Sequence, residues 1–111
     1  MSTYTYKNFK LVLTASYVSA YTCPASTTSI VTHCQAANID GVNTVVLDGQ
    51  WLDDSDTDAA IRLVSALSIP IGSSIAPIDG QLVLETGDQL QFKAAATGDI
   101  EVSGSVVEIT A

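Results

Sequence analysis

The sequence predicts an all-β protein: a single antiparallel β-sandwich, of the jelly-roll or immunoglobulin-like kind, with about eight or nine short strands. Three observations lead to this prediction. Several segments alternate apolar and polar residues with a period of two, turn residues separate them at roughly regular spacing, and only residues 59 to 67 admit a helical interpretation. The chain has 111 residues, so residues 1 to 111 are expected to form one domain.

The clearest alternation lies between Gln81 and Thr110. Its apolar positions are Leu82, Leu84, Leu90, Phe92 and Ala94. The Thr-Gly-Asp triplets at 86–88 and 97–99 supply a glycine for positive φ and an aspartate that can bond the turn's own backbone. We therefore expect three strands joined by two antiparallel hairpins. A bulge near Gly104 is also expected, because neither face of the last strand is cleanly apolar without one.

The first half of the chain carries further strand signals. Strands are expected over residues 9 to 16, 17 to 22, 27 to 37 and 42 to 47. The Asp40-Gly41 pair is a turn signal, so the third and fourth of these are expected to form a hairpin. Residues 1 to 8 form either a terminal strand or an N-terminal arm laid on a neighbouring molecule.

Residues 59 to 67 follow an acidic stretch and allow two interpretations. Asp56 or Asp58 could cap a helix over this segment. Alternatively, a strand places on one face the residues Ile61, Leu63, Leu67, Ile69 and Ile71. We favour the strand. Pro70 and Pro77 then fit the edge of a sheet, since proline donates no ladder hydrogen bond.

The composition excludes several kinds of partner. Four Lys and Arg against twelve Asp and Glu give a formal charge of −8, so neither nucleic acid nor an anionic membrane surface is an expected partner. No apolar run reaches the roughly 18 to 20 residues that span a bilayer. A 47% hydrophobic content leaves surplus apolar surface in so small a domain, which predicts a homo-oligomer. The N-terminus does not resemble a secretory signal, so synthesis in a cytoplasm is expected.

Asp54, Asp56 and Asp58 have the spacing that begins a calcium loop. Such a loop also needs glycine at its sixth position and glutamate at its twelfth, where this chain has Ala59 and Ser65. The prediction is therefore a solvated acidic loop and no metal site, with these three aspartates as the calcium candidates.

Neither a catalytic centre nor a cofactor site is expected. Cys23 and Cys34 are spaced so that a disulfide is permitted but not required, and together with His33 they lack the paired spacing of a zinc site. In a regular strand His33 and Cys34 point to opposite faces. The sequence has a single histidine and lacks a motif that positions a nucleophilic serine, such as the Gly-x-Ser-x-Gly elbow. We expect no enzymatic activity.

Trp51 precedes the acidic loop and has two interpretations. A tryptophan at the rim of a sandwich can stack on a sugar, in which case the acidic loop and Trp51 would form a carbohydrate-binding module. The alternative is that the indole closes one end of the core.

Two regions resemble small β-sandwich structural proteins of tailed bacteriophages. The C-terminal region contributes Ile69-Pro70-Ile71-Gly72-Ser73-Ser74, Leu82-Val83-Leu84-Glu85-Thr86-Gly87-Asp88 and Gly104-Ser105-Val106-Val107-Glu108-Ile109, and the N-terminal region contributes Tyr21-Thr22-Cys23-Pro24-Ala25 and Ala36-Ala37-Asn38. The resemblance covers about the last 90 residues and implies a virion protein. It implies a capsid decoration or cement protein bound to the major capsid protein, or else a neck or tail component.

Overall fold

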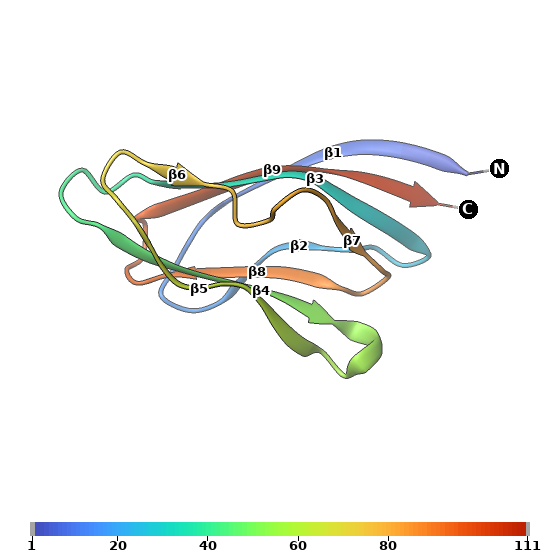
Figure 1. Ribbon diagram of the computed structural model, residues 1–111. Coiled ribbons are helices and arrows are strands. Elements are labelled where there is room, and N and C mark those ends of the chain that lie inside the picture. The colour runs from blue at the N-terminus through green and yellow to red at the C-terminus, as the bar shows by residue number, and fades with distance from the viewer. Residues whose placement is uncertain (1, 111) are drawn as a thin grey trace.

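The computed structural model describes residues 2 to 110 and confirms the predicted β-sandwich. Two antiparallel sheets pack face to face (Figure 1). The described elements are β1 (Thr3–Val12), β2 (Val18–Thr22), β3 (Thr27–Asn38), β4 (Val45–Asp53), the 3₁₀ helix η1 (Asp54–Asp56), β5 (Ala59–Ile69), β6 (Ser74–Ile75), β7 (Leu82–Leu84), β8 (Gln89–Ala94) and β9 (Ile100–Thr110). Residues 59 to 67 are a strand, as favoured from the sequence.

The order of strands is that of a jelly roll. One sheet runs β1-β9-β3-β6, with β7 also paired to β3, and the other runs β2-β8-β4-β5. The first strand pairs with the last, β2 with β8, β3 with β6 and β7, and β4 with β5. The chain thus folds as one long antiparallel hairpin, with its turn at η1, that is rolled into two layers.

All three predicted hairpins are wrong. β7 pairs with β3, β8 with β2 and β4, and β9 with β1 and β3, so consecutive strands of the C-terminal segment lie in opposite sheets. β3 and β4 are likewise in different sheets. Each of these turns carries the chain across the sandwich instead of back along the same sheet. Period-two alternation reports which face of a strand is buried, not which strand lies beside it.

The predicted bulge near Gly104 is also wrong. β9 pairs with β1 without interruption from Thr110 to Glu101, and the bulge lies in the neighbouring strand β3, between Val31 and His33. Gly104 is needed for close approach, because a Cβ there would lie 2.3 Å from Cζ of Phe9. The buried Glu108, and not a shift of register, is what makes the inner face of β9 look mixed in the sequence.

The N-terminal strand is longer at its start than predicted. Residues 3 to 8 belong to β1, so of the two interpretations of residues 1 to 8 the structure supports the terminal strand, with Met1 outside the described residues. The predicted extension to Ser16 is wrong, because β1 ends at Val12 and the chain then crosses to the other sheet.

The core fills the space between the sheets. Its largest fully buried apolar side chains are Phe92, Leu13, Leu47, Ile69, Leu84, Leu90 and Ile100. The molecule is elongated, 51 × 27 × 20 Å, and both ends of the chain lie at one end of the long axis (Figure 1). No helix among the described residues has the length and apolar character needed to cross a membrane.

Candidate functional site

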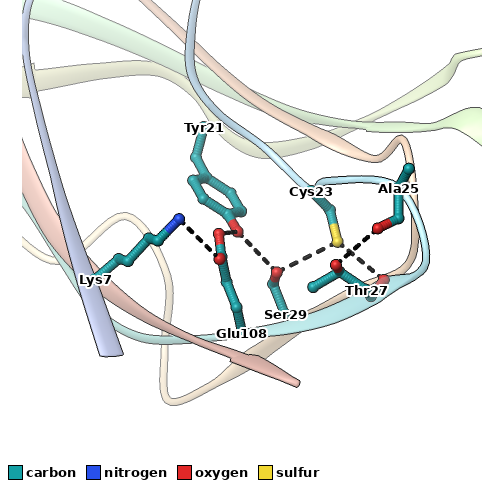
Figure 2. Close-up of polar contacts among 7 residues, drawn as sticks. All are labelled: Lys7, Tyr21, Cys23, Ala25, Thr27, Ser29 and Glu108. Carbon is teal, nitrogen blue, oxygen red and sulfur yellow. Dashed lines mark hydrogen bonds and ion pairs between the residues drawn. The ribbon is translucent and has the colours of Figure 1, made fainter. Parts of the chain in front are cut away.

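A polar network joins the two sheets (Figure 2). It lies toward the end of the sandwich that carries the termini, since Lys7 belongs to the first half of β1 and Glu108 to the last residues of β9. The Tyr21 hydroxyl, from β2, donates to Oε2 of Glu108 on β9 at 2.5 Å and lies 2.8 Å from Oγ of Ser29 on β3. Nζ of Lys7, on β1, lies 3.1 Å from the second Glu108 oxygen, Oε1. Period-two geometry brings these side chains together, because all four lie on inner faces of their strands.

The network stabilises a carboxylate inside the sandwich. Glu108 is only 7% exposed. The Tyr21 hydrogen bond, with a smaller contribution from Lys7, holds the pKa of Glu108 below its usual range. Burial, and secondarily the hydrogen bond to Glu108, raises the pKa of Tyr21 well above its usual value. The hydroxyl therefore stays protonated at neutral pH and acts as a hydrogen-bond donor that ties β2 to the opposite sheet.

Cys23 extends this network but is not activated by it. Its Sγ lies 3.3 Å from Oγ of Ser29 and donates to the Thr27 carbonyl oxygen at 3.3 Å. Burial raises the pKa of Cys23, and burial raises the pKa of Cys34 to about 12. Both cysteines are free, so the disulfide permitted by the sequence is absent here. Because the thiolate is the reactive form, neither thiol is poised for nucleophilic chemistry.

A group of carboxylates lies where η1 meets the turn between β7 and β8. Asp53, Glu85 and Asp88 place one carboxylate oxygen each within 4.8 Å of the others, and they form the only such group of three found in residues 2 to 110. Asp88 is 1% exposed and accepts from the backbone N–H of Asp54 at 3.0 Å and of Glu85 at 2.9 Å. Its role in this structure is to fasten the two turns together.

The calcium candidates from the sequence do not form this group. Asp54 and Asp56 are exposed in η1, and Asp58 is exposed in the turn that follows. Asp53, Glu85 and Asp88 could instead supply the oxygens for a cation. Sequence spacing missed Glu85 and Asp88 because they come from a turn about thirty residues away. The available signal was the Gly87-Asp88 turn itself, whose aspartate bonds the backbone as predicted.

The remaining candidates from the sequence are also dispersed. Trp51 is half-buried and packs against the core, as in the interpretation that it closes one end of the sandwich. His33 is exposed, whereas Cys34 is buried on the other face of β3, as expected from strand geometry.

An apolar patch covers the outer face of the β1 sheet near the termini. Cross-strand register aligns Tyr6 with Val107, Val107 with Ile30, and Ile30 with Val83, across four strands, while Tyr4 pairs with Ile109 in the adjacent row. We call these six residues the terminal apolar patch. Tyr6 is 80% exposed and Tyr4 62% exposed. A contiguous apolar patch that exposes large aromatic side chains to solvent is typical of a surface that contacts another molecule.

Farther along the same outer face lies an open hollow of about 650 Å³. It is lined by Lys10, Leu11 and Val12 of β1, Gln35 and Ala37 of β3, and Glu101, Val102 and Ser103 of β9. The outer face of the β1 sheet thus combines an apolar end and a hollowed, mixed polar end. This arrangement favours a docking surface over a reaction site.

Solved structures with the same fold include proteins of quite different assemblies. A protein of the disulfide-linked pili of Bacillus endospore appendages matches with a TM-score of 0.56 and 13% identity over 98% of this chain and 88% of its own. A chain of the T13 particle of infectious bursal disease virus matches with a TM-score of 0.57 and 10% identity, over 96% of this chain and 31% of that one. The Drosophila NLP core, described in terms of pentamer formation and histone binding, matches with a TM-score of 0.53 and 13% identity. The match covers 90% of this chain and 98% of the NLP-core chain.

No protein-family model matches the sequence, and no curated protein matches it. The present chain spans about a third of the viral chain's length. At 10 to 13% identity, these likenesses establish the β-sandwich fold. One fold serves many functions, so a role must be inferred from the surfaces of this chain itself.

Proposed function

We propose that this protein is a non-enzymatic virion structural protein of a tailed bacteriophage: a capsid decoration or cement protein on the outer surface of the head. It would be made in the cytoplasm of the host bacterium and bind the major capsid protein. The observation that carries the proposal is the exposed terminal apolar patch on a jelly roll whose polar groups serve to hold its sheets together.

Several further observations support this role. The resemblance in sequence points to phage virions, and the fold is shared with a chain of a virus particle and with a protein of disulfide-linked pili. The formal charge of −8 suits a protein on the outside of a shell and disfavours contact with packaged nucleic acid. The contacts of Tyr21, Glu108 and Cys23 stabilise the fold, and burial keeps the tyrosine hydroxyl and the cysteine thiol protonated.

A cement protein binds the assembled shell and not its dissociated subunits, so it stabilises the shell by mass action. The test is to delete the gene, purify the particles and compare DNA release on heating and at low salt with that of undeleted particles. We expect particles that assemble normally but release DNA at a lower temperature. Adding the purified protein back should restore the original heat resistance.

Two other outcomes would contradict the decoration role. Tail-less or empty heads would place the protein in the neck or tail, the other location that the sequence resemblance implies. Intact particles with unchanged heat resistance would exclude a cementing role. In that case, binding to glycans, with Trp51→Ala as the variant, would test the carbohydrate-binding interpretation.

A further inference from the structure

The four edges of the two sheets differ in how open they are to another strand. Unpaired edge strands invite pairing with other chains, and proteins blunt them with bulges, prolines or very short strands. Strand β2, at one edge of its sheet, has five residues and a register break between Ser19 and Tyr21. Strand β5, at the other edge, breaks register twice against β4 and has Ala66 at φ +50°. Both edges of this sheet are thus irregular.

The β1 sheet has one blunted edge and one open edge. Its blunted edge consists of β6 and β7, with two and three residues, separated by a connection that contains Pro77. The opposite edge is β1, which pairs with β9 over ten consecutive residues without a register break. Among the strands of residues 2 to 110, β1 is therefore the only edge that is both long and regular.

The side chains of β1 add to this open edge. Tyr4 and Tyr6, its most exposed apolar residues, belong to the terminal apolar patch, so the free edge and the patch form one continuous surface. Lysine on an edge strand can itself discourage pairing. However, Lys7 lies on the inner face of β1, where its ammonium group forms an ion pair with Glu108. Lys10 is therefore the outward-facing cation of the strand.

Charge indicates which partner fits this surface. Residues 2 to 13 contain Lys7 and Lys10 and no carboxylate, whereas the rest of the chain contains two cations and all twelve carboxylates. β1 is thus the cationic segment of a strongly acidic protein. A second copy of the chain offers Lys10 an acidic surface, whereas β1 against β1 would set Lys10 beside a strand that carries no carboxylate.

We infer that the β1 edge and the terminal apolar patch form the surface on which a second copy of this chain docks, head to tail, with β1 of one copy against an acidic surface of the next. The inference rests on the self-assembly included in the proposed function and specifies its surface. A head-to-tail contact closes into a ring when the rotation between neighbours permits.

The test compares matched substitutions in the full chain. Tyr6 and Val42 are similarly exposed apolar residues, 80% and 76%, but Val42 lies in the connection between β3 and β4, outside the patch. Self-association is measured by sedimentation equilibrium for the unchanged protein, Tyr6→Ser and Val42→Ser. We expect Tyr6→Ser to weaken association at least about tenfold, as for a central aromatic of an interface, and Val42→Ser to leave it unchanged.

A second pair of variants tests the charge argument. Lys10→Glu should weaken association, whereas Lys93→Glu, on the opposite sheet, should not. Melting temperatures within about 3 °C of the unchanged protein would show that the variants remain folded. Amide exchange should slow along β1 as the protein is concentrated, since a second copy that covers β1 shields its free N–H groups from water.

The outcomes separate this inference from the proposed function. Equal effects of Tyr6→Ser and Val42→Ser on an associating protein would overturn the assignment of the surface and leave the decoration role standing. A monomer up to about 100 μM would overturn docking of a second copy. The decoration role is tested independently, by DNA release from particles that lack the protein.

Discussion

Glu108 is a carboxylate held inside a sandwich by one hydroxyl and one ammonium group. Its pKa is lowered in the folded protein. Its contribution to stability is therefore present above the pKa of the unfolded chain, about 4.3, and is lost as pH falls through the lower, folded value. This single residue makes the attachment of β2 to the opposite sheet depend on pH.

Tyr21→Phe should reduce the free energy of unfolding at pH 7 by about 1 to 2 kcal/mol, because it removes a hydrogen bond to a buried charge. The difference from the unchanged protein should shrink as pH falls below about 4.3, the pKa of the unfolded chain, toward the lower pKa that Glu108 has in the folded protein. Urea unfolding at pH 7 and pH 3 measures both values. Tyr17→Phe is the control, since Tyr17 lies near Arg62 and Lys93 and not near this network. A pH-independent loss in Tyr21→Phe would contradict the assignment.

Cys23 and Cys34 are buried thiols whose pKa values are raised. Because the thiolate is the form that reacts, both should resist a thiol reagent in the folded protein and react in denaturant. We expect two free thiols per chain in protein purified without reductant and then unfolded. Fewer than two would indicate oxidation or a bridge that the folded arrangement does not contain.

At the scale of strands, each sheet contains a glycine covered by a phenylalanine of the neighbouring strand. Phe9 pairs with Gly104 and Phe92 with Gly49. A Cβ at Gly104 would lie 2.3 Å from the Phe9 ring and 2.4 Å from the carbonyl oxygen of His33, whereas a Cβ at Gly49 would meet the Phe92 ring at 2.7 Å. The first obstruction includes backbone, and the second consists of side chains.

Gly104→Ala should therefore cost at least about 3 kcal/mol of stability, and Gly49→Ala about 1 to 3 kcal/mol, as for overpacking. A double-mutant cycle of Gly49→Ala with Phe92→Leu should show favourable coupling, because the smaller side chain makes room. The cycle of Gly104→Ala with Phe9→Leu should recover less, because the His33 carbonyl does not move away. Gly41→Ala, with open space around it, is the control.

The turns also act as units. Asp88→Ala should cost about 2 to 3 kcal/mol, because it leaves the N–H groups of Asp54 and Glu85 without their acceptor. Asp99→Ala, at the matching position of the next Gly-Asp turn, should cost under about 0.5 kcal/mol, as at an ordinary surface site. Thermal unfolding of the two variants measures the contrast. Equal losses would mean that the Asp88 carboxylate does not fasten the two turns.

At the scale of the whole molecule, the jelly roll is one long hairpin rolled into two layers, with both termini at the same end as the terminal apolar patch. We predict a homo-oligomer in solution, with a trimer favoured because decoration proteins are often placed on threefold axes of the shell. Light scattering coupled to gel filtration should give three times the mass of the chain. A stable monomer would remove the support drawn from the 47% hydrophobic content.

Much of the fold is predictable because its signals are local. β3 and β5 fall within one or two residues of the predicted segments, and Gly87 and Gly98 adopt the positive φ that their turns require. The candidate site is much less predictable. Asp53, Glu85 and Asp88 meet only after folding, and Tyr21 reaches Glu108 across 87 positions of sequence.

The fold class, an antiparallel β-sandwich, could be predicted from the sequence alone, as could the position of most strands and the buried face of β7 and β8. Alternation and turn chemistry encode these features within a few residues. Which strands are neighbours becomes clear only in the folded protein. That choice depends on contacts between distant segments, and it alone placed Lys7, Tyr21 and Glu108 together, left β1 as the open edge and gathered the terminal apolar patch from four strands.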